Sequence, residues 1–591
     1  MPADKRLSRF STLSIKKVNI KFSTFFKTPY LEIAVSVVVG FCALCIFTSI
    51  SILDVTNIAW LQVGERPVFY MGWAFSRNAD WTIPLGMLPS YGLELQNSIV
   101  YNDSIPLLAT FFKIFRKILP EPFQYFGLWI LLCFILQAYF GWKIVSLFIK
   151  NNWERLFATI LLVISPPMLY RMDAHLGLGG HFFLLAALYL ALCPDMKKQL
   201  TRWSVLLVIA VLCHFYLFFM ALLFWAASAA TRVWLKKTNI KSIIIETACI
   251  FVLVIFFAWL VGYFTVSDGV TGNSSYGFYR ANLVTFFNPQ KWSFIIPEIT
   301  IGWGDYEGFS YYGLGIILLF FMSLPFVFTR FKEYKNIVTK YWILLSIAIV
   351  SFFFGLSNTI SFSTWDIIQY KLPESVIHLS SILRMSGRFV WPLFYISIIF
   401  YLYSVVKYYK ENIVILFLLI ACFFQFLDTR ALWMHSKYTY RMPPSKTWDI
   451  VMKHAFWEQA AQKYSKMRGI FVFRDLTYWA DIGYFALTHH LGTDMTITAR
   501  TDMKRFEKQN NETLNRFDTG HYESDTFYIF DNSYLSRFTE RVQKAVEKVD
   551  RKKDLIAKID VFYVIAPGWK ECSDCMTLKE LEVEDIPLPK E

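Results

Sequence analysis

The chain has 591 residues, of which 55% are hydrophobic and 19% aromatic, and its mean hydropathy is +0.40. These values exclude an ordinary soluble globular protein and indicate a polytopic α-helical membrane protein. The formal net charge is +14. The basic residues fall mostly between apolar runs, as in loops that face an anionic membrane surface, so nucleic acid is not an expected partner.

The N-terminal segment, residues 1–30, is strongly basic. It carries seven Lys and Arg residues against one acidic residue, Asp4. The positive-inside rule therefore predicts a cytoplasmic tail. The apolar run that follows is too long for a signal peptide and shows no cleavage site, so the run is expected to remain as the first span.

Eleven apolar runs predict membrane-spanning helices. The run 203–232 is interpreted as two helices broken near "CHFY" (213–216), because only then do all the short basic connections fall on the cytoplasmic side. The N-terminus is then cytoplasmic and the C-terminus lies outside. The runs lie at about 31–53, 126–149, 156–172, 177–194, 203–214, 216–232, 243–264, 312–330, 341–357, 391–406 and 412–427.

In this arrangement the long connections, 54–125, 265–311 and 358–390, all fall on the outer side of a transmembrane domain that spans residues 31–430. Residues 431–591 have a different, charged composition. They are predicted to form a periplasmic α/β domain, because strand-like and helical patterns alternate. The strand-like runs are 469–476, 525–530 and 558–567, and helical periodicity appears at 447–466 and 537–550.

Cys572 and Cys575 form a C-x-x-C pair in this C-terminal region. An outer location favours a local disulfide, with free thiols and a metal as alternatives. A single such pair is a weak zinc signal, because zinc requires further ligands.

Two acidic residues of the first outer loop are candidates for chemistry. Glu65 follows the first span, where burial and neighbouring arginines can tune a carboxylate as a general base. The alternative is a solvated loop charge beside Arg66. Asp103 lies in "SIVYNDSIPLLA" (98–109) and is either a helix N-cap or a site residue.

Three further segments gather polar residues at the outer boundary. "YRMDAHLGLGGH" (170–181) contains His175 and His181, and its glycines permit close backbone approach to a ligand. The spacing of the two histidines is poor for a metal, and a structural role is the alternative. "GDYEGFSYYGLG" (304–315) and "SILRMSGRFVWP" (381–392) flank later spans.

Arg384 and Arg388 are four residues apart, so on a helix they share a face. Two guanidinium groups near the outer interface are suited to grip a phosphate through charge-assisted hydrogen bonds. The alternative is that both extend towards lipid headgroups.

Several motifs are missing from the sequence. It has no P-loop, no G-x-G-x-x-G before a helix and no G-x-S-x-G. Nucleotide hydrolysis, dinucleotide binding and serine hydrolase chemistry are therefore not expected.

The segments "GWAFSRNADWTIPLGMLPSYG", "NSIVYNDSIPLLA", "EPFQYFGLW", "YEGFSYYGLG" and "RMSGRFVWP" resemble a family of bacterial inner-membrane glycosyltransferases of GT-C type. The architecture is similar to that of the serotype-converting O-antigen glucosyltransferases. The resemblance covers roughly residues 55–430 and is weaker in the tail, at "TITARTD" (496–502). It implies a GT-C-like transmembrane domain.

The resemblance also implies a reaction and its residues. Glu65 falls where the family more often has Asp, and Val68 and Phe69 replace its usual Gln-His pair. A hexose, glucose in the related enzymes, would move from undecaprenyl phosphate to a surface glycan such as lipopolysaccharide O-antigen. The implied roles are Glu65 and Asp103 for catalysis, Arg384 and Arg388 for donor phosphate, and Trp73, Arg77, Tyr91, Arg171, His175, His181 and Glu307 for sugar or acceptor.

The expected partners follow from this reading. They are the lipid-linked sugar, the glycan acceptor and the bilayer, with a donor synthase and a flippase in the same pathway. No cofactor is predicted, and the requirement for a divalent metal stays open. The alternatives are a transporter or flippase of lipid-linked sugar, against which the lack of inverted repeats counts, and a non-enzymatic envelope assembly protein.

Overall fold

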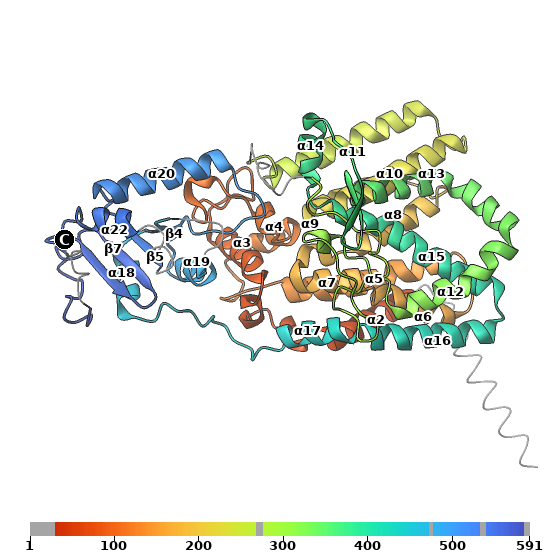
Figure 1. Cartoon of the computed structure of the whole chain (residues 1–591), viewed down its shortest axis with the longest axis horizontal. Helices are drawn as coiled ribbons and strands as arrows, with labels where there is room; N and C mark the ends of the chain where they lie inside the picture. The colour runs from red at the N-terminus through yellow and green to blue at the C-terminus, as the bar shows by residue number, and fades with distance from the viewer. Residues whose placement is uncertain (1–29, 267–275, 472–476, 532–538, 584–591) are drawn as a thin grey trace, which may run out of the picture.

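The computed structural model describes residues 30–266, 276–471, 477–531 and 539–583. The basic tail, residues 1–29, lies outside these ranges. A bundle of long helices and a smaller α/β domain lie at opposite ends of the molecule, and the first outer loop, with its helices α3 (Arg66–Asn78) and α4 (Pro106–Ile114), lies between them (Figure 1).

The bundle consists of apolar helices, many of which expose aliphatic and aromatic side chains. On α11, for example, Ile244, Val252 and Phe256 are all exposed, as expected for a surface that contacts lipid. The bundle helices are α2 (Tyr30–Phe47), α5 (Phe126–Val145), α6 (Asn152–Val163), α7 (Pro166–Ala174), α8 (Phe182–Leu192), α9 (Gln199–Cys213), α10 (Phe215–Trp234), α11 (Ile240–Leu260), α12 (Leu314–Thr329), α13 (Phe331–Leu356), α15 (Trp391–Tyr408) and α16 (Glu411–Asp428).

In the described part of the chain, seven helices are long and apolar enough to cross a membrane. The pair α6 and α7, bent by 41°, makes an eighth candidate if it is one span, and three shorter apolar helical segments (176–192, α9 and α12) complete the bundle. Each apolar run predicted from the sequence therefore contains helix. The chain has the helices of a multi-pass membrane protein, and eleven crossings stays a prediction.

The uncertain run 203–232 is two helices, as predicted. His214 separates α9 from α10 in an extended conformation, and its Nδ1 accepts a hydrogen bond from the Tyr216 amide at 3.2 Å. The break therefore has a side-chain cap, which satisfies one of the free amides at the start of α10.

The outer loops and the C-terminal domain gather at one end of the bundle, where α2, α7, α9, α11, α13 and α16 end. The loop between α13 and α15 holds a hairpin of β1 (Thr359–Phe362) and β2 (Trp365–Gln369), then α14 (Glu374–Ser380) and two short 3-10 helices, η7 (Ser381–Leu383) and η8 (Ser386–Val390). The remaining short helices of the outer loops are η1 (Ile50–Leu53), η2 (Ala59–Gln62), η3 (Leu93–Leu95), η4 (Ile99–Asn102), η5 (Leu176–Gly179) and η6 (Asp305–Gly308).

The C-terminal region forms a mixed five-stranded sheet in the order β4-β3-β5-β7-β6, with β3 parallel to β4 and β5. The predicted run 558–567 covers the end of β6, the turn and β7. The strand predicted at 469–476 begins earlier and ends at Gly469, and residues 472–476 of that prediction lie outside the described residues. The elements are α17 (Arg430–Tyr440), α18 (Ala455–Lys463), β3 (Lys466–Gly469), α19 (Trp479–Thr488), β4 (Gly492–Thr493), α20 (Met503–Thr519), β5 (Thr526–Asp531), α22 (Thr539–Val546), β6 (Leu555–Ile559) and β7 (Phe562–Ala566).

The α/β domain docks on the first outer loop through backbone hydrogen bonds. The Thr493 amide donates to Ser90 O (2.9 Å), and the Gly92 amide donates to Thr493 O (2.8 Å). Arg468 reinforces the contact through both oxygens of Glu94, at 2.6 and 3.1 Å. The loop thus extends the sheet beyond its edge strand β4, which covers that edge.

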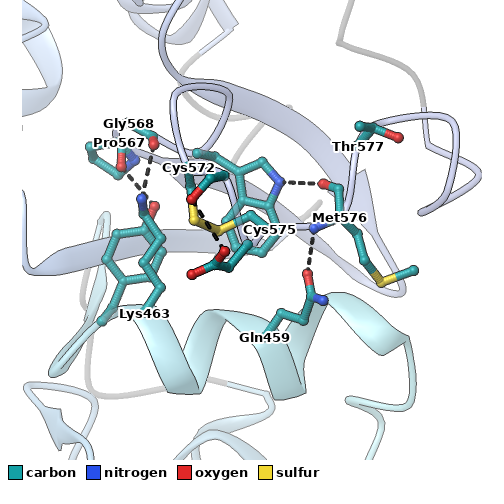
Figure 2. The surroundings of a disulfide bond; sticks show 12 residues. Gln459, Lys463, Pro567, Gly568, Cys572, Cys575, Met576 and Thr577 are labelled. Atoms are coloured by element: carbon teal, nitrogen blue, oxygen red, sulfur yellow. Dashed lines mark hydrogen bonds between the residues drawn. A yellow bond between two sulfur atoms is a disulfide. The ribbon is translucent and has the colours of Figure 1, made fainter.

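Cys572 and Cys575 form a disulfide near the C-terminal end of the described chain, as predicted (Figure 2). The turn is fixed by the Trp569 indole, which donates to Met576 O (3.0 Å), and by the Met576 amide, which donates to Gln459 Oε1 (2.7 Å). The pair therefore has a structural setting against α18.

Candidate functional site

A cluster of charged side chains from five separate loops lies at the end of the bundle that carries the outer loops. Each residue lies in or directly beside a helix at this end of the bundle. They are Glu65, Asp103, Arg171, His175, His214, Glu307 and Arg388.

Glu307 holds the centre of the cluster between two arginines. Arg171 Nη2 donates to Glu307 Oε2 at 2.8 Å, and Arg388 Nε donates to the same oxygen at 2.9 Å. All three side chains are at most 5% exposed. Burial alone would raise the pKa of Glu307, but the two guanidinium groups outweigh it and hold the pKa well below its usual range. Glu307 is therefore ionised, and the trio carries a net positive charge.

Two glycines bring Glu307 and Arg388 together. Gly308 follows Glu307 in η6, and Gly387 precedes Arg388 in η8. A Cβ on Gly387 would lie 2.7 Å from the Gly308 nitrogen, which is closer than real Cβ contacts allow. The two segments therefore touch backbone to backbone, and side chains at either position would separate the ion pair.

Arg388 uses only part of its hydrogen-bonding capacity. Its Nε bonds to Glu307, and its guanidinium carbon lies 4.8 Å from the centre of the Tyr216 ring. Within the described residues, the two Nη groups have no hydrogen-bond partner. A buried guanidinium with free donors is suited to bind an anion.

Glu65 lies beside His175, with 3.2 Å between its Oε2 and the imidazole Nδ1. Glu65 stands at the N-cap position of α3 but makes no capping hydrogen bond. Its neighbour Arg66 is buried and bonds to Asp173 Oδ1 at 2.7 Å, which fixes the start of α3 against the end of α7. The Glu65 carboxylate is thus held in place while 61% of the side chain stays exposed.

The surroundings of Glu65 raise its pKa to about 7. Desolvation by the enclosing protein is the main cause, and the carboxylates of Glu307 and Asp103 add to it, against the opposing effect of the two arginines. Burial and the same arginines lower the pKa of His175 to about 3, so its imidazole is neutral at pH 7. Glu65 therefore titrates near neutral pH, as a general base requires.

Asp103 lies 3.8 Å from the His214 Nε2 and belongs to the same cluster. It has a positive φ of 48°, a conformation that Asp tolerates better than most residues. The N-cap of α4 is Ile105, without a side-chain hydrogen bond, so Asp103 does not cap α4; it is the residue that follows η4. Burial raises the pKa of Asp103 to about 6.

Three residues that the resemblance implies for sugar or acceptor binding are buried in the protein. Trp73 and Tyr91 are fully buried, and Trp73 donates to Phe123 O (2.7 Å) while Tyr91 stacks on Phe75. Arg77 is 7% exposed and bonds to the carbonyls at the end of the α4 region. These three side chains pack the first outer loop.

His181 also lies apart from the cluster. Its Nδ1 is 2.8 Å from the Tyr395 hydroxyl, and the ring packs on Trp391 inside the bundle. These contacts place His181 in the packing between α8 and α15.

The predicted pairing of Arg384 with Arg388 is wrong in its geometry. The segment is not one α-helix: η7 ends at Leu383, η8 begins at Ser386, and Arg384 lies between them. Arg384 Nη2 donates to Ala499 O in the "TITARTD" segment at 2.8 Å. Arg171 takes its place, because it shares Glu307 with Arg388.

Sequence reasoning missed His214, which it used only to mark a helix break. A histidine at an interrupted helix pair on the outer side is a signal that the sequence did contain. Val68 and Phe69, where the related family has a Gln-His pair, are partly and fully buried, and Phe69 O accepts from Ser104 (2.7 Å). They pack the loop that positions Glu65 and Asp103.

Among the described residues, no three His, Cys, Asp or Glu side chains lie close enough to hold a metal ion. The cluster pairs each acid with a cation or an imidazole instead. The cluster thus combines a carboxylate whose pKa is near neutral, Glu65, with two arginines that share Glu307.

The chain was compared with protein families, curated proteins and solved structures. No curated protein matches its sequence. Its structure is similar to the crystal structure of the Archaeoglobus fulgidus oligosaccharyltransferase in the apo form, with a TM-score of 0.35 and 11% identity over 90% of this chain and 74% of that one. The family "DUF6311 C-terminal domain" matches residues 456–567. The family "Domain of unknown function (DUF6311)" matches residues 37–430, two thirds of the sequence, and the chain belongs to this family.

Proposed function

We propose that this protein is a membrane glycosyltransferase of GT-C type that moves a hexose from a polyprenyl-phosphate donor to a glycan acceptor at the outer face of the membrane. The observation that carries the proposal is that one cluster holds Glu65, an accessible carboxylate with a pKa of about 7, and Arg388, a buried arginine with free donors. The disulfide fits an oxidising outer compartment. A bacterial inner membrane with the N-terminus in the cytoplasm belongs to the same proposal.

The reaction assigns a task to each part of the cluster. The Glu65 carboxylate removes the proton from an acceptor hydroxyl as its oxygen attacks the anomeric carbon of the donor sugar. The bond from that carbon to the phosphate oxygen breaks with both electrons, and the polyprenyl phosphate leaves. Positive charge develops on the sugar ring, as in other glycosyl transfers, and a single displacement inverts the anomeric configuration.

Arg388 is the proposed phosphate contact, with Arg171 as its support. Because Glu307 already binds one face of each guanidinium, the trio is fixed before the donor arrives, and the free Nη groups of Arg388 need little rearrangement to stabilise the leaving phosphate. His175, neutral at pH 7, orients the Glu65 carboxylate. Asp103 raises the pKa of Glu65 and thereby strengthens it as a base.

The test uses purified full-length protein in proteoliposomes with polyprenyl-phosphate hexose and a surface-glycan acceptor. Wild type should form a new glycosidic bond, and Glu65→Gln should lower turnover by ~10²–10⁴-fold. Asp80→Asn, which neutralises an exposed acid of the same loop, is the matched control. Full turnover in Glu65→Gln would refute the assigned base. Movement of the lipid-linked sugar across the bilayer without any new bond would favour a transporter.

A further inference from the structure

A cavity of about 130 Å³ lies at the end of the bundle opposite the Glu65 cluster. It is enclosed by the C-terminal ends of α8 and α10 and by the first half of α13. Its volume is roughly ten times the ~10–15 Å³ that one water needs on the same measure. The lining residues are Ala191, Leu192, Pro194, Asp195, Ala227, Thr231, Leu235, Lys237, Lys340, Tyr341 and Leu344.

The cavity is amphiphilic. Its buried wall is apolar, with Ala191, Ala227 and Leu344 at most 7% exposed. Its exposed rim carries two ammonium groups, those of Lys237 and Lys340. α13 has non-helical backbone angles at Tyr341, directly after Lys340, so the rim lysine stands at a kink in the helix. A group that is apolar on one side and anionic on the other complements this shape.

Two tryptophans mark the depth of the cavity in the membrane. Trp234 ends α10 and Trp342 follows the kink in α13, and their rings pack edge to face with centroids 6.1 Å apart. They are 44% and 45% exposed. Tryptophan is enriched at the level of lipid headgroups, so the mouth of the cavity lies at that level.

The charges of the rim are unbalanced. Lys237 forms an ion pair with Asp195, which joins the ends of α8 and α10. The Lys340 ammonium lies 4.9 Å from the centre of the Tyr341 ring, and among the described residues no carboxylate lies within ion-pair distance of it. The lining thus holds two ammonium groups and one carboxylate, which leaves a positive charge for an anionic ligand.

We propose that this cavity binds the phosphodiester headgroup of an anionic phospholipid. Lys340 contacts the phosphate, Lys237 and the Thr231 hydroxyl flank it, and the glycerol end of an acyl chain lies along Ala227 and Leu344. Basic pockets between transmembrane helices at headgroup level bind such lipids in general. The site stands apart from the Glu65 cluster and does not depend on the reaction proposed for it.

The experiment is lipid binding to the detergent-solubilised full-length protein, followed by native mass spectrometry with phosphatidylglycerol and phosphatidylcholine. Phosphatidylglycerol should bind more tightly, and Lys340→Gln should weaken it about five-fold, the contribution of one lysine near an anionic headgroup. Lys332→Gln, which changes an exposed lysine of α13 outside the cavity, should leave the affinity unchanged.

Three results would overturn the proposal. They are equal affinity for the two lipids, equal loss in both lysine variants, and displacement of phosphatidylglycerol by inorganic phosphate at equal concentration. The last would indicate a site for a free anion, because it would show that the apolar wall contributes nothing. Both lysines are exposed, so neither variant is expected to disturb folding.

Discussion

Among the described residues, two buried glutamates form ion pairs with arginine: Glu246 at one end of the bundle, and Glu307 in the outer loop at the other end. They differ in the number of arginines that each binds. Glu246 in α11 binds one arginine: Arg232 reaches both of its oxygens, at 2.6 and 2.9 Å, and the Trp225 indole donates a third hydrogen bond at 2.9 Å. Glu307 binds two arginines, and two further carboxylates, Glu65 and Asp103, lie nearby.

This difference distinguishes a structural ion pair, at Glu246, from a candidate functional site, at Glu307. At Glu246 one charge meets one charge, and each carboxylate oxygen accepts at least one of the three hydrogen bonds. At Glu307 the cations outnumber their bound acid, one guanidinium keeps free donors, and the neighbouring Glu65 is 61% exposed. Uncompensated charge in a buried setting is costly, and proteins retain it mainly where function requires it.

The largest expected effect comes from removing each glutamate. Glu246→Gln and Glu307→Gln should each lower the free energy of unfolding by about 3–5 kcal/mol, because each leaves buried arginine without its partner. Denaturant or thermal unfolding in detergent measures this change. Transfer activity per folded molecule should fall in Glu307→Gln alone.

Ligand binding gives a second way to tell the two ends apart. An added phosphate ester should restore stability to Glu307→Gln, because it can bind the freed arginines, and should do nothing for Glu246→Gln. If Glu246→Gln lost turnover while it remained folded, the distinction between the two ends would be wrong.

The next prediction concerns the close contact between Gly387 and Gly308, which brings Arg388 to Glu307. Gly387→Ala places a Cβ 2.7 Å from the Gly308 nitrogen, so the two segments must separate, at a cost of about 1–3 kcal/mol. Gly483→Ala in α19 is the control, because its nearest contact would be 3.5 Å. Unfolding should show the stability loss and the transfer assay a loss of activity, both in Gly387→Ala alone. Equal behaviour of the two variants would mean that the approach of the glycines does not position Arg388.

Much of the fold could be predicted because its signals are local. Apolar runs indicate helices, and basic connections indicate the cytoplasmic side of the membrane. Together these two signals predicted the break between α9 and α10 near His214 and predicted that all the long loops lie at one end of the bundle. The hairpin of β6 and β7 was less visible, because its turn residues Asp560 and Val561 lie within a continuous apolar pattern.

The site was predictable only in part, because its geometry depends on contacts between loops far apart in sequence. Glu65, Asp103 and Arg388 were candidates from residue type, position and the resemblance, and the resemblance also named Arg171, His175 and Glu307. The partner of Arg388 was not, because a spacing of four residues indicates a shared face only on a continuous helix, and the chain between η7 and η8 is not one. Likewise, aromatic residues in an outer loop suggest a sugar surface, whereas Trp73 and Tyr91 are buried against the rest of that loop.

The smallest expected effect is on the pH dependence of stability, and it compares Glu65 in the cluster with a glutamate that forms an ordinary ion pair. The Glu65 carboxyl has a pKa near 4.5 in the unfolded chain and about 7 in the folded protein. Between these values the folded protein binds the proton more tightly, so wild type loses stability as the pH rises through this interval. Glu65→Gln removes the loss and should raise Tm relative to wild type above pH 7, with little difference below pH 4.

For Glu94 the expected change of stability with pH has the opposite sign. Desolvation raises its pKa, but its hydrogen bonds with Arg468 outweigh this and keep the pKa below the usual value. Its contribution to stability is therefore present above the unfolded pKa and is lost as the pH falls. Glu94→Gln should thus lower Tm at neutral pH, most at high pH, while Glu65→Gln raises it. Parallel pH profiles of Tm for the two variants would show that Glu65 is an ordinary loop charge, because removing a carboxylate stabilises the protein only where its surroundings, such as desolvation and neighbouring carboxylates, disfavour the charged form.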